Sequence, residues 1–87
     1  MSEDIEVRRK RAAWRAAHRG TKELDLLVGR FAEARLPAMT VAEIEHFEKF
    51  LAVTTPEIQG WLLAPSLPVA PEFADMVAEI RAFHGLA

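Results

Sequence analysis

The sequence predicts an all-α protein, folded as a compact antiparallel bundle of five short helices in one domain that spans residues 1–87. Apolar residues recur at the i, i+3, i+4, i+7 spacing of a helix face within residues 24–31 and again within residues 73–83. No segment alternates β-branched and polar residues over the length that a strand needs. With 51% hydrophobic and 28% charged residues, the composition is typical of a folded chain rather than a disordered one.

The first two helices are expected to meet at a tight corner. The first covers residues 5–19, where acidic residues come first and basic residues last, which suits the helix dipole. Gly20 is expected to end it with a left-handed backbone, and Thr21 to cap the next helix. That second helix continues to Arg35, because the step at residues 36–37 places a leucine before a proline and disfavours helical backbone there.

Local capping signals mark the third and fourth helices. Thr40 and Glu43 have the spacing of a capping box, in which each side chain accepts a hydrogen bond from a backbone N–H at the start of the third helix. The fourth helix opens at residues 54–57 with Pro56 in its first position, where the missing N–H would have no helical partner anyway. It ends at residues 64–65, an alanine followed by a proline.

The last helix follows a proline-rich segment. Residues 65–71 contain three prolines and are expected to form an extended connector. The fifth helix then covers about residues 72–84 and ends at Gly85. The residues expected in the hydrophobic core are Leu24, Leu27, Val28, Phe31, Ile44, Phe47, Leu51, Phe73, Met76, Val77 and Ile80.

Charge is distributed unevenly along a chain whose net charge is -2. Residues 1–35 contain nine basic and six acidic side chains, a net of +3, whereas residues 36–87 contain two basic and seven acidic ones, a net of -5. Such polarity can orient a partner by complementary potential. The sequence has no cysteine, which excludes disulfides, thiolate chemistry, iron–sulfur ligation and cysteine-based zinc sites.

Metal and catalytic sites are not predicted. Glu43 and His46 have the Glu-x-x-His spacing of carboxylate-bridged di-iron bundles, but such a site needs two of these pairs and two further carboxylates. Ser2 lies at a terminus and Ser66 in the proline-rich connector, and no spacing links either hydroxyl to a base. We therefore expect no catalytic residue and no enzyme.

A basic run in the first helix provides the alternative functional interpretation. Arginines and a lysine occupy residues 8–11, further basic residues follow, and Trp14 stands among them. A basic helix with an aromatic side chain can follow phosphates and stack on a base. The alternative function is therefore a small helical nucleic-acid-binding module that uses this helix. The acidic net charge and the lack of other basic elements favour a chain with no nucleic-acid partner.

The corner between the first two helices is the other candidate site. Arg19 offers a planar fork of donors, Glu23 offers two acceptors, and Gly20 between them lets another backbone approach closely. If the helix breaks at Gly20, both charged side chains are expected to project from one exposed corner. Chemistry alone leaves two interpretations equally open, a capped turn with a surface ion pair or a docking site.

The same corner carries a family resemblance that extends over most of the chain. Its centre is Arg19-Gly20-Thr21-Lys22-Glu23, an Arg-Gly-x-x-Glu motif that leads into the leucine-rich residues 24–32. The basic first helix, the Phe47…Phe50-Leu51 segment and residues 55–62, which include Trp61, extend the resemblance from about residue 8 to residue 84. The sequence thus resembles the succinate dehydrogenase assembly factors, the SdhE family of bacteria and their mitochondrial relatives. Position 21 is threonine here, whereas many members have methionine.

The resemblance implies a five-helix, chaperone-like assembly factor and not an enzyme. Such a factor binds the flavoprotein subunit of succinate dehydrogenase and promotes covalent attachment of FAD to it, so FAD belongs to the partner and no cofactor to this chain. The flavoprotein of fumarate reductase is an additional candidate partner. The residues that the resemblance and the local chemistry assign to partner binding are Arg15, His18, Arg19, Gly20, Glu23 and Asp25.

The remaining expectations concern the state of the protein in the cell. The residues after Met1 are acidic and not apolar, and no stretch approaches the roughly 20 apolar residues that span a bilayer. We expect a cytoplasmic protein without membrane insertion, monomeric when free.

Overall fold

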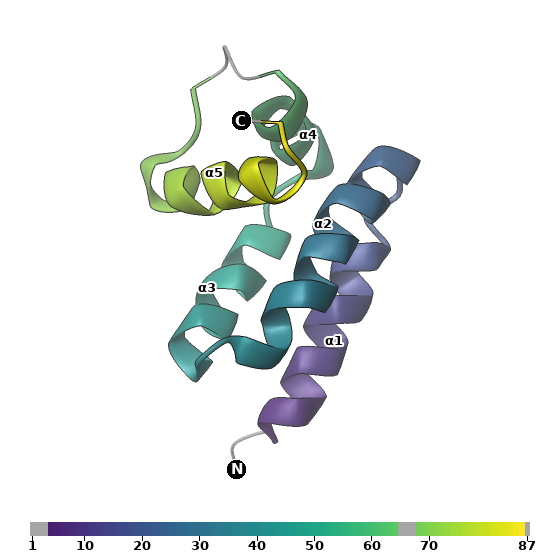
Figure 1. Ribbon diagram of the computed structural model, residues 1–87, viewed down its shortest axis with the longest axis vertical. Helices are drawn as coiled ribbons and strands as arrows, with labels where there is room; N and C mark the ends of the chain where they lie inside the picture. The colour runs from purple at the N-terminus through teal and green to yellow at the C-terminus, as the bar shows by residue number, and fades with distance from the viewer. Residues whose placement is uncertain (1–3, 65–67, 87) are drawn as a thin grey trace. The chain divides into compact units, whose positions relative to one another are not determined.

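The computed structural model describes residues 4–64 and 68–86, and across these residues it contains helices and no strand (Figure 1). The all-α prediction with five α-helices is confirmed. The elements in chain order are α1 (Ile5–Ala17), α2 (Lys22–Arg35), the 3-10 helix η1 (Leu36–Ala38), α3 (Val41–Leu51), α4 (Thr55–Leu63), the 3-10 helix η2 (Pro71–Phe73) and α5 (Ala74–Phe83). They group into two compact units, Met1–Ala52 and Val53–Ala87, which are described separately. The single domain stays a prediction.

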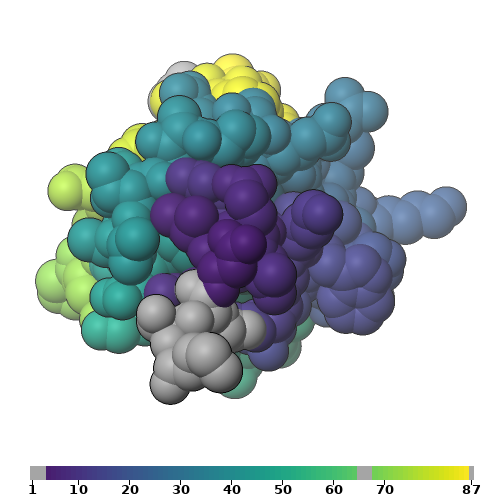
Figure 2. Space-filling model, turned by 90° about the horizontal axis from the view of Figure 1, so that it is seen from below, coloured from purple at the N-terminus to yellow at the C-terminus, as the bar shows by residue number. Residues whose placement is uncertain are grey.

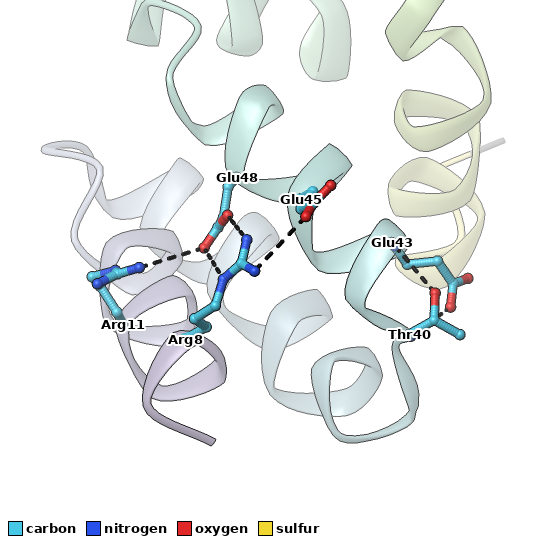
Figure 3. Close-up of polar contacts among 6 residues, drawn as sticks. All are labelled: Arg8, Arg11, Thr40, Glu43, Glu45 and Glu48. Carbon is cyan, nitrogen blue, oxygen red and sulfur yellow. Dashed lines mark hydrogen bonds and ion pairs between the residues drawn. The ribbon is translucent and has the colours of Figure 1, made fainter. Parts of the chain in front are cut away.

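The predicted helix starts are present in the first unit. The Thr21 hydroxyl oxygen accepts the N–H of Leu24 at 3.2 Å and caps α2. The capping box is complete, since Thr40 N–H donates to Glu43 Oε1 at 2.8 Å and Glu43 N–H donates to Thr40 Oγ1 at 3.2 Å (Figure 3). α1 ends at Ala17, two residues earlier than predicted, because His18 already leaves the helical backbone with φ -129° and ψ 58°.

The second unit, α4 to α5, follows the predicted pattern with a later start of the last α-helix. α4 begins at Thr55 with Pro56 in its first turn, and a 3-10 turn, η2, precedes α5. Gly85, with φ +70°, ends α5: Gly85 N–H donates to Ala82 O at 3.0 Å and Leu86 N–H donates to Arg81 O at 2.8 Å. These two bonds form a Schellman motif, the glycine-dependent helix end. Of the predicted connector, residues 65–67 lie outside the described residues.

Aromatic side chains fill the centre of the first unit. Phe31 of α2 and Phe47 of α3 lie with their ring centroids 6.2 Å apart, and the Phe50 ring is 6.3 Å from that of Phe47. All three are fully buried. In the second unit, the rings of Trp61 and Phe73 lie 6.1 Å apart and join α4 to η2.

Most of the predicted core is buried, with two exceptions and several additions. Leu27 and Met76 are only half-buried. The buried residues that the core prediction lacked are Ala12, Ala16, Ala32, Leu36, Phe50, Ile58 and Leu62. The alanines were missed because a small side chain adds little to a hydrophobic pattern, although it is the only kind that fits where two helices approach closely.

α1 lies close against α2 because the facing side chains are small. The only residues of α1 that are buried are Ala12 and Ala16. Opposite the end of α1, Gly29 of α2 faces Ala17 so closely that a Cβ at position 29 would stand 3.1 Å from Ala17 Cα and 3.2 Å from Ala17 Cβ. The neighbour is helical backbone and a methyl group, neither of which can rotate away. A side chain at position 29 would therefore require α1 and α2 to move apart by a few tenths of an ångström.

Gly29→Val is expected to lower the free energy of unfolding by about 2 kcal/mol, because the added methyl groups overpack the contact with Ala17. Ala34→Val is the matched control, since Ala34 is exposed on the same helix and tests only the poorer helix propensity of valine. Urea unfolding followed by circular dichroism measures both variants. Equal losses in the two variants would contradict the close contact.

Candidate functional site

The loop between α1 and α2, residues 18–21, is held by the first turns of α2. We call it the motif loop. The carboxylate of Asp25 accepts two of its backbone N–H groups at Oδ1, that of Arg19 at 2.5 Å and that of Gly20 at 3.2 Å. The Thr21 side chain binds back to Leu24 in the same helix. Because its polar groups are paired with α2, the loop has a defined backbone shape.

The Arg19 side chain turns toward α3 and not away from the molecule. Its NH1 donates to the carbonyl of Leu51, and its Nε is buried. Leu51 is the last residue of α3, so its carbonyl has no partner within the helix, and a positive charge suits this end of the helix dipole. Burial lowers the pKa of the Arg19 guanidinium from its ordinary value, and the charge of Asp25 opposes that shift.

Gly20 is the exposed tip of the motif loop. Its φ is +107°, which side chains of L-residues rarely adopt, and a Cβ built there would meet no atom within 4 Å. In the free chain, glycine is therefore required by the backbone and not by a neighbouring group. The space within 4 Å of that position is open.

Glu23 is exposed in the first turn of α2. Glu23 and Arg19 do not form the outward-facing pair that the sequence predicts, because the helix is interrupted between them and the Arg19 side chain points to α3.

Of the six residues predicted for partner binding, four are exposed and two are half-buried. The exposed ones are Arg15, His18, Gly20 and Glu23, and the half-buried ones are Arg19 and Asp25.

An aromatic pair joins the last turn of α1 to the start of the motif loop. Trp14 leaves 63% of its surface exposed, and its ring stacks on the His18 imidazole with centroids 4.2 Å apart and planes inclined by 15°. The His18 Nδ1–H donates to the Trp14 carbonyl at 2.7 Å, which fixes the imidazole on the indole. Sequence reasoning assigned Trp14 only to the nucleic-acid alternative. The i, i+4 spacing of Trp14 and His18 was the signal that could have placed the two rings together.

The arginines of the basic run of α1 are engaged in bonds within the chain. Arg8 binds the carboxylate of Glu48 on α3 with two nitrogens, at 3.4 Å for Nε and 2.6 Å for NH2 (Figure 3). Arg11 lies 3.8 Å from the same carboxylate, and Arg8 lies 3.9 Å from that of Glu45. In the space-filling view, purple atoms of α1 lie beside teal atoms of α3 (Figure 2).

Arg9 is committed in the same way to the turn that follows α2. Its Nε donates to the Leu36 carbonyl at 3.0 Å and its NH2 to the Met39 carbonyl at 2.9 Å, while NH1 binds Glu6 at 2.5 Å. Three arginines of the basic run thus serve contacts between α1 and the rest of the first unit. The nucleic-acid alternative gains no support from this helix.

Comparison with known proteins gives the chain a family. Residues 10–84 match the family Sdh5, described as flavinator of succinate dehydrogenase. The chain belongs to this family. A FAD assembly factor SdhE of Acetobacter pasteurianus is 36% identical over 87 residues, which cover 95% of this chain and 80% of the relative. The FAD assembly factor SdhE of Coxiella burnetii is 33% identical over 72 residues, 83% of this chain and 87% of the relative.

A mitochondrial relative matches a shorter part of its own length. The succinate dehydrogenase assembly factor 2 of Komagataella phaffii is 37% identical over 60 residues, which are 69% of this chain and 32% of the relative. The resemblance inferred from the Arg-Gly-x-x-Glu motif is confirmed. In this member of the Sdh5 family, the motif forms the corner built from Arg19, Gly20 and Glu23.

Two remaining features of the described residues concern metal binding and membrane crossing. Within residues 4–64 and 68–86, no group of three or more histidine, aspartate or glutamate side chains is arranged to hold a metal ion. Glu43, one half of the Glu-x-x-His spacing, uses its carboxylate to cap α3. No helix in this described part of the chain combines the length and the apolar character needed to cross a membrane.

Gly20→Ala is expected to lower the free energy of unfolding by about 1–2 kcal/mol, because an L-residue is strained in the left-handed region. Since no atom lies within 4 Å of the new Cβ, this loss comes from the backbone alone. Gly20→Asn is the control and is expected to lose less, because asparagine tolerates positive φ better than alanine. Urea unfolding compares them, and a loss that is the same for both would argue against a backbone origin.

Proposed function

We propose that this chain is an assembly factor that binds the flavoprotein subunit of succinate dehydrogenase and promotes covalent attachment of FAD to it. One observation carries the proposal: nearly the whole chain, residues 10–84, matches the flavinator family. Relatives named FAD assembly factor align with 83–95% of the chain. The Arg-Gly-x-x-Glu motif on which the resemblance was founded occupies an exposed corner of the first unit.

The docking surface in this proposal is the motif loop with the first turn of α2 and the last turn of α1. Glu23 presents a carboxylate to solvent, and Gly20 leaves room for a second backbone beside it. Arg15 is exposed in the last turn of α1, and His18 is exposed at the start of the loop. Arg19 and Asp25, predicted as contacts, belong to the same corner and are half-buried.

The chain acts on its partner by position and not as a catalyst. FAD and the residue that receives it belong to the flavoprotein, and this chain holds the flavoprotein in the arrangement in which the bond forms. Holding reacting groups in place lowers a barrier without supplying a reactive side chain. The flavoprotein of fumarate reductase is a further candidate partner. The factor is proposed to work in the cytoplasm, as a monomer when free, with its 87 residues acting as one domain.

The direct test adds this chain and FAD to purified flavoprotein that lacks flavin. Covalent flavin is measured by its fluorescence after denaturing electrophoresis, because only covalently attached flavin stays with the polypeptide. We expect attachment to accelerate in the presence of the chain. Equal attachment with and without it would overturn the proposed function.

Glu23→Gln is expected to weaken flavoprotein binding by roughly tenfold or more, since a bond to a charged group is worth about 1.5–3 kcal/mol. Glu33→Gln is the matched control, because Glu33 is exposed on the same helix about 15 Å along its axis. Both affinities are measured by titration of labelled flavoprotein. Equal effects of the two substitutions would remove Glu23 from the docking surface.

Trp14→Ala is expected to weaken the same complex by roughly tenfold, because exposed tryptophans at an interface commonly contribute more than 1 kcal/mol. Val7→Ala is the control, since Val7 is 51% exposed on the same helix, two turns before Trp14 and on nearly the same face. Neither variant is expected to unfold the chain, because neither side chain is in the core. A Trp14 variant with unchanged affinity would exclude the aromatic pair from the interface.

A further inference from the structure

We propose that Arg19 and Asp25 act within this chain as positioning residues: they set the shape of the motif loop before the flavoprotein arrives, and Glu23 and Gly20 make the contacts. This inference rests on the proposed function for the identity of the partner. The corner then has an inward pair, Arg19 and Asp25, that shapes the loop, and an outward group, Glu23 and Gly20, that binds.

The first observation that supports this proposal is the bond between Arg19 and α3. The guanidinium NH1 donates to the Leu51 carbonyl, which is 32 residues away in the chain and lies at the end of a helix. That carbonyl lacks a helical partner, and the helix end favours a positive charge. The loop is thereby tied to a rigid element outside its own hairpin. A side chain held in this way is not available as an outward prong.

The second observation is the bond between Asp25 and the backbone of the motif loop. One oxygen, Oδ1, accepts the N–H groups of two successive residues, Arg19 and Gly20. This pairing fixes the loop where the chain must turn through the positive φ of Gly20. Asp25 itself is held in α2, where its N–H donates to the Thr21 carbonyl at 2.9 Å. The loop is therefore fastened from two sides, to α3 through a side chain and to α2 through its backbone.

Such fastening matters because a loop that is disordered before binding has to be ordered during it. The apparent affinity then falls by the fraction of free molecules that have the competent shape. Loss of a positioning residue lowers that fraction and so slows association, while the complex, once formed, dissociates as before. Loss of a contact residue leaves the free loop unchanged and speeds dissociation.

The test measures association and dissociation rates with the purified flavoprotein. Arg19→Ala and Asp25→Ala are expected to slow association by roughly tenfold, with dissociation changed less than twofold. Glu23→Gln is expected to show the opposite pattern, with roughly tenfold faster dissociation. The conservative variants Arg19→Lys and Asp25→Asn keep a donor or an acceptor in place and are expected to recover part of the association rate. If Arg19→Ala instead speeds dissociation at an unchanged association rate, Arg19 is a contact residue and the inference is wrong.

A second measurement needs no partner. In the free chain, backbone amide relaxation by NMR is expected to show Gly20 and Thr21 as rigid in the unsubstituted protein and in Glu23→Gln. The same amides are expected to become mobile in Arg19→Ala and Asp25→Ala, with the signals of the α1–α3 core kept. A loop that stays rigid in both alanine variants would overturn the inference. A chain that fails to bind any flavoprotein would overturn the proposed function and leave this measurement intact.

Discussion

The described part of the chain depends on one recurring interaction, the donation of arginine N–H groups to carbonyls at the ends of helices. Arg9 binds the carbonyls of the turn after α2, and Arg19 binds the last residue of α3. In the second unit, Arg81 binds the carbonyl of Leu62 near the end of α4 and that of Leu86 beyond α5. The C-terminal end of every helix has carbonyls without a helical partner, and one planar guanidinium can donate hydrogen bonds to two of them at once. A small chain with little core gains order from these bonds where packing alone gives less.

This use of arginine changes the meaning of the basic first helix. A cluster of arginines on one helix suggests a surface for phosphates when the sequence is considered alone. In the folded chain, Arg8 meets a carboxylate of α3 and Arg9 meets the carbonyls after α2, so these charges serve contacts between helices. What the last turn of α1 and the first residue of the motif loop present to solvent is different in kind. It is an indole stacked on an imidazole, together with Arg15. Such a mixed surface suits a protein partner better than it suits the uniform phosphate backbone of a nucleic acid.

Local signals in the sequence predicted the helix caps well, whereas contacts between residues far apart in the chain could not be predicted from it. Thr21 and Thr40 were placed correctly because a cap depends only on the next three residues. The Arg19 direction could not be predicted, because its acceptor is Leu51, which periodicity places on a helix without saying which helix end faces the loop. The sequence shows Gly29 only as part of a leucine-rich segment. Its close contact with Ala17 is visible only in the folded chain. The sequence named the residues of this corner, whereas the division between inward-facing and outward-facing side chains required the fold, and their part in partner binding stays a prediction.

The three defining positions of the motif do not carry the same information about function. The φ of Gly20 already requires glycine there in the free chain, and the carbonyl at the end of α3 already gives Arg19 a role. Both residues would therefore be needed for the corner to form, even in a chain that bound nothing. Only Glu23 is exposed without any such role in the loop's shape, apart from the small benefit of an acidic residue at a helix start. A match to the motif therefore indicates the fold of this corner first, and Glu23 is the motif position that we propose for contact with a second protein.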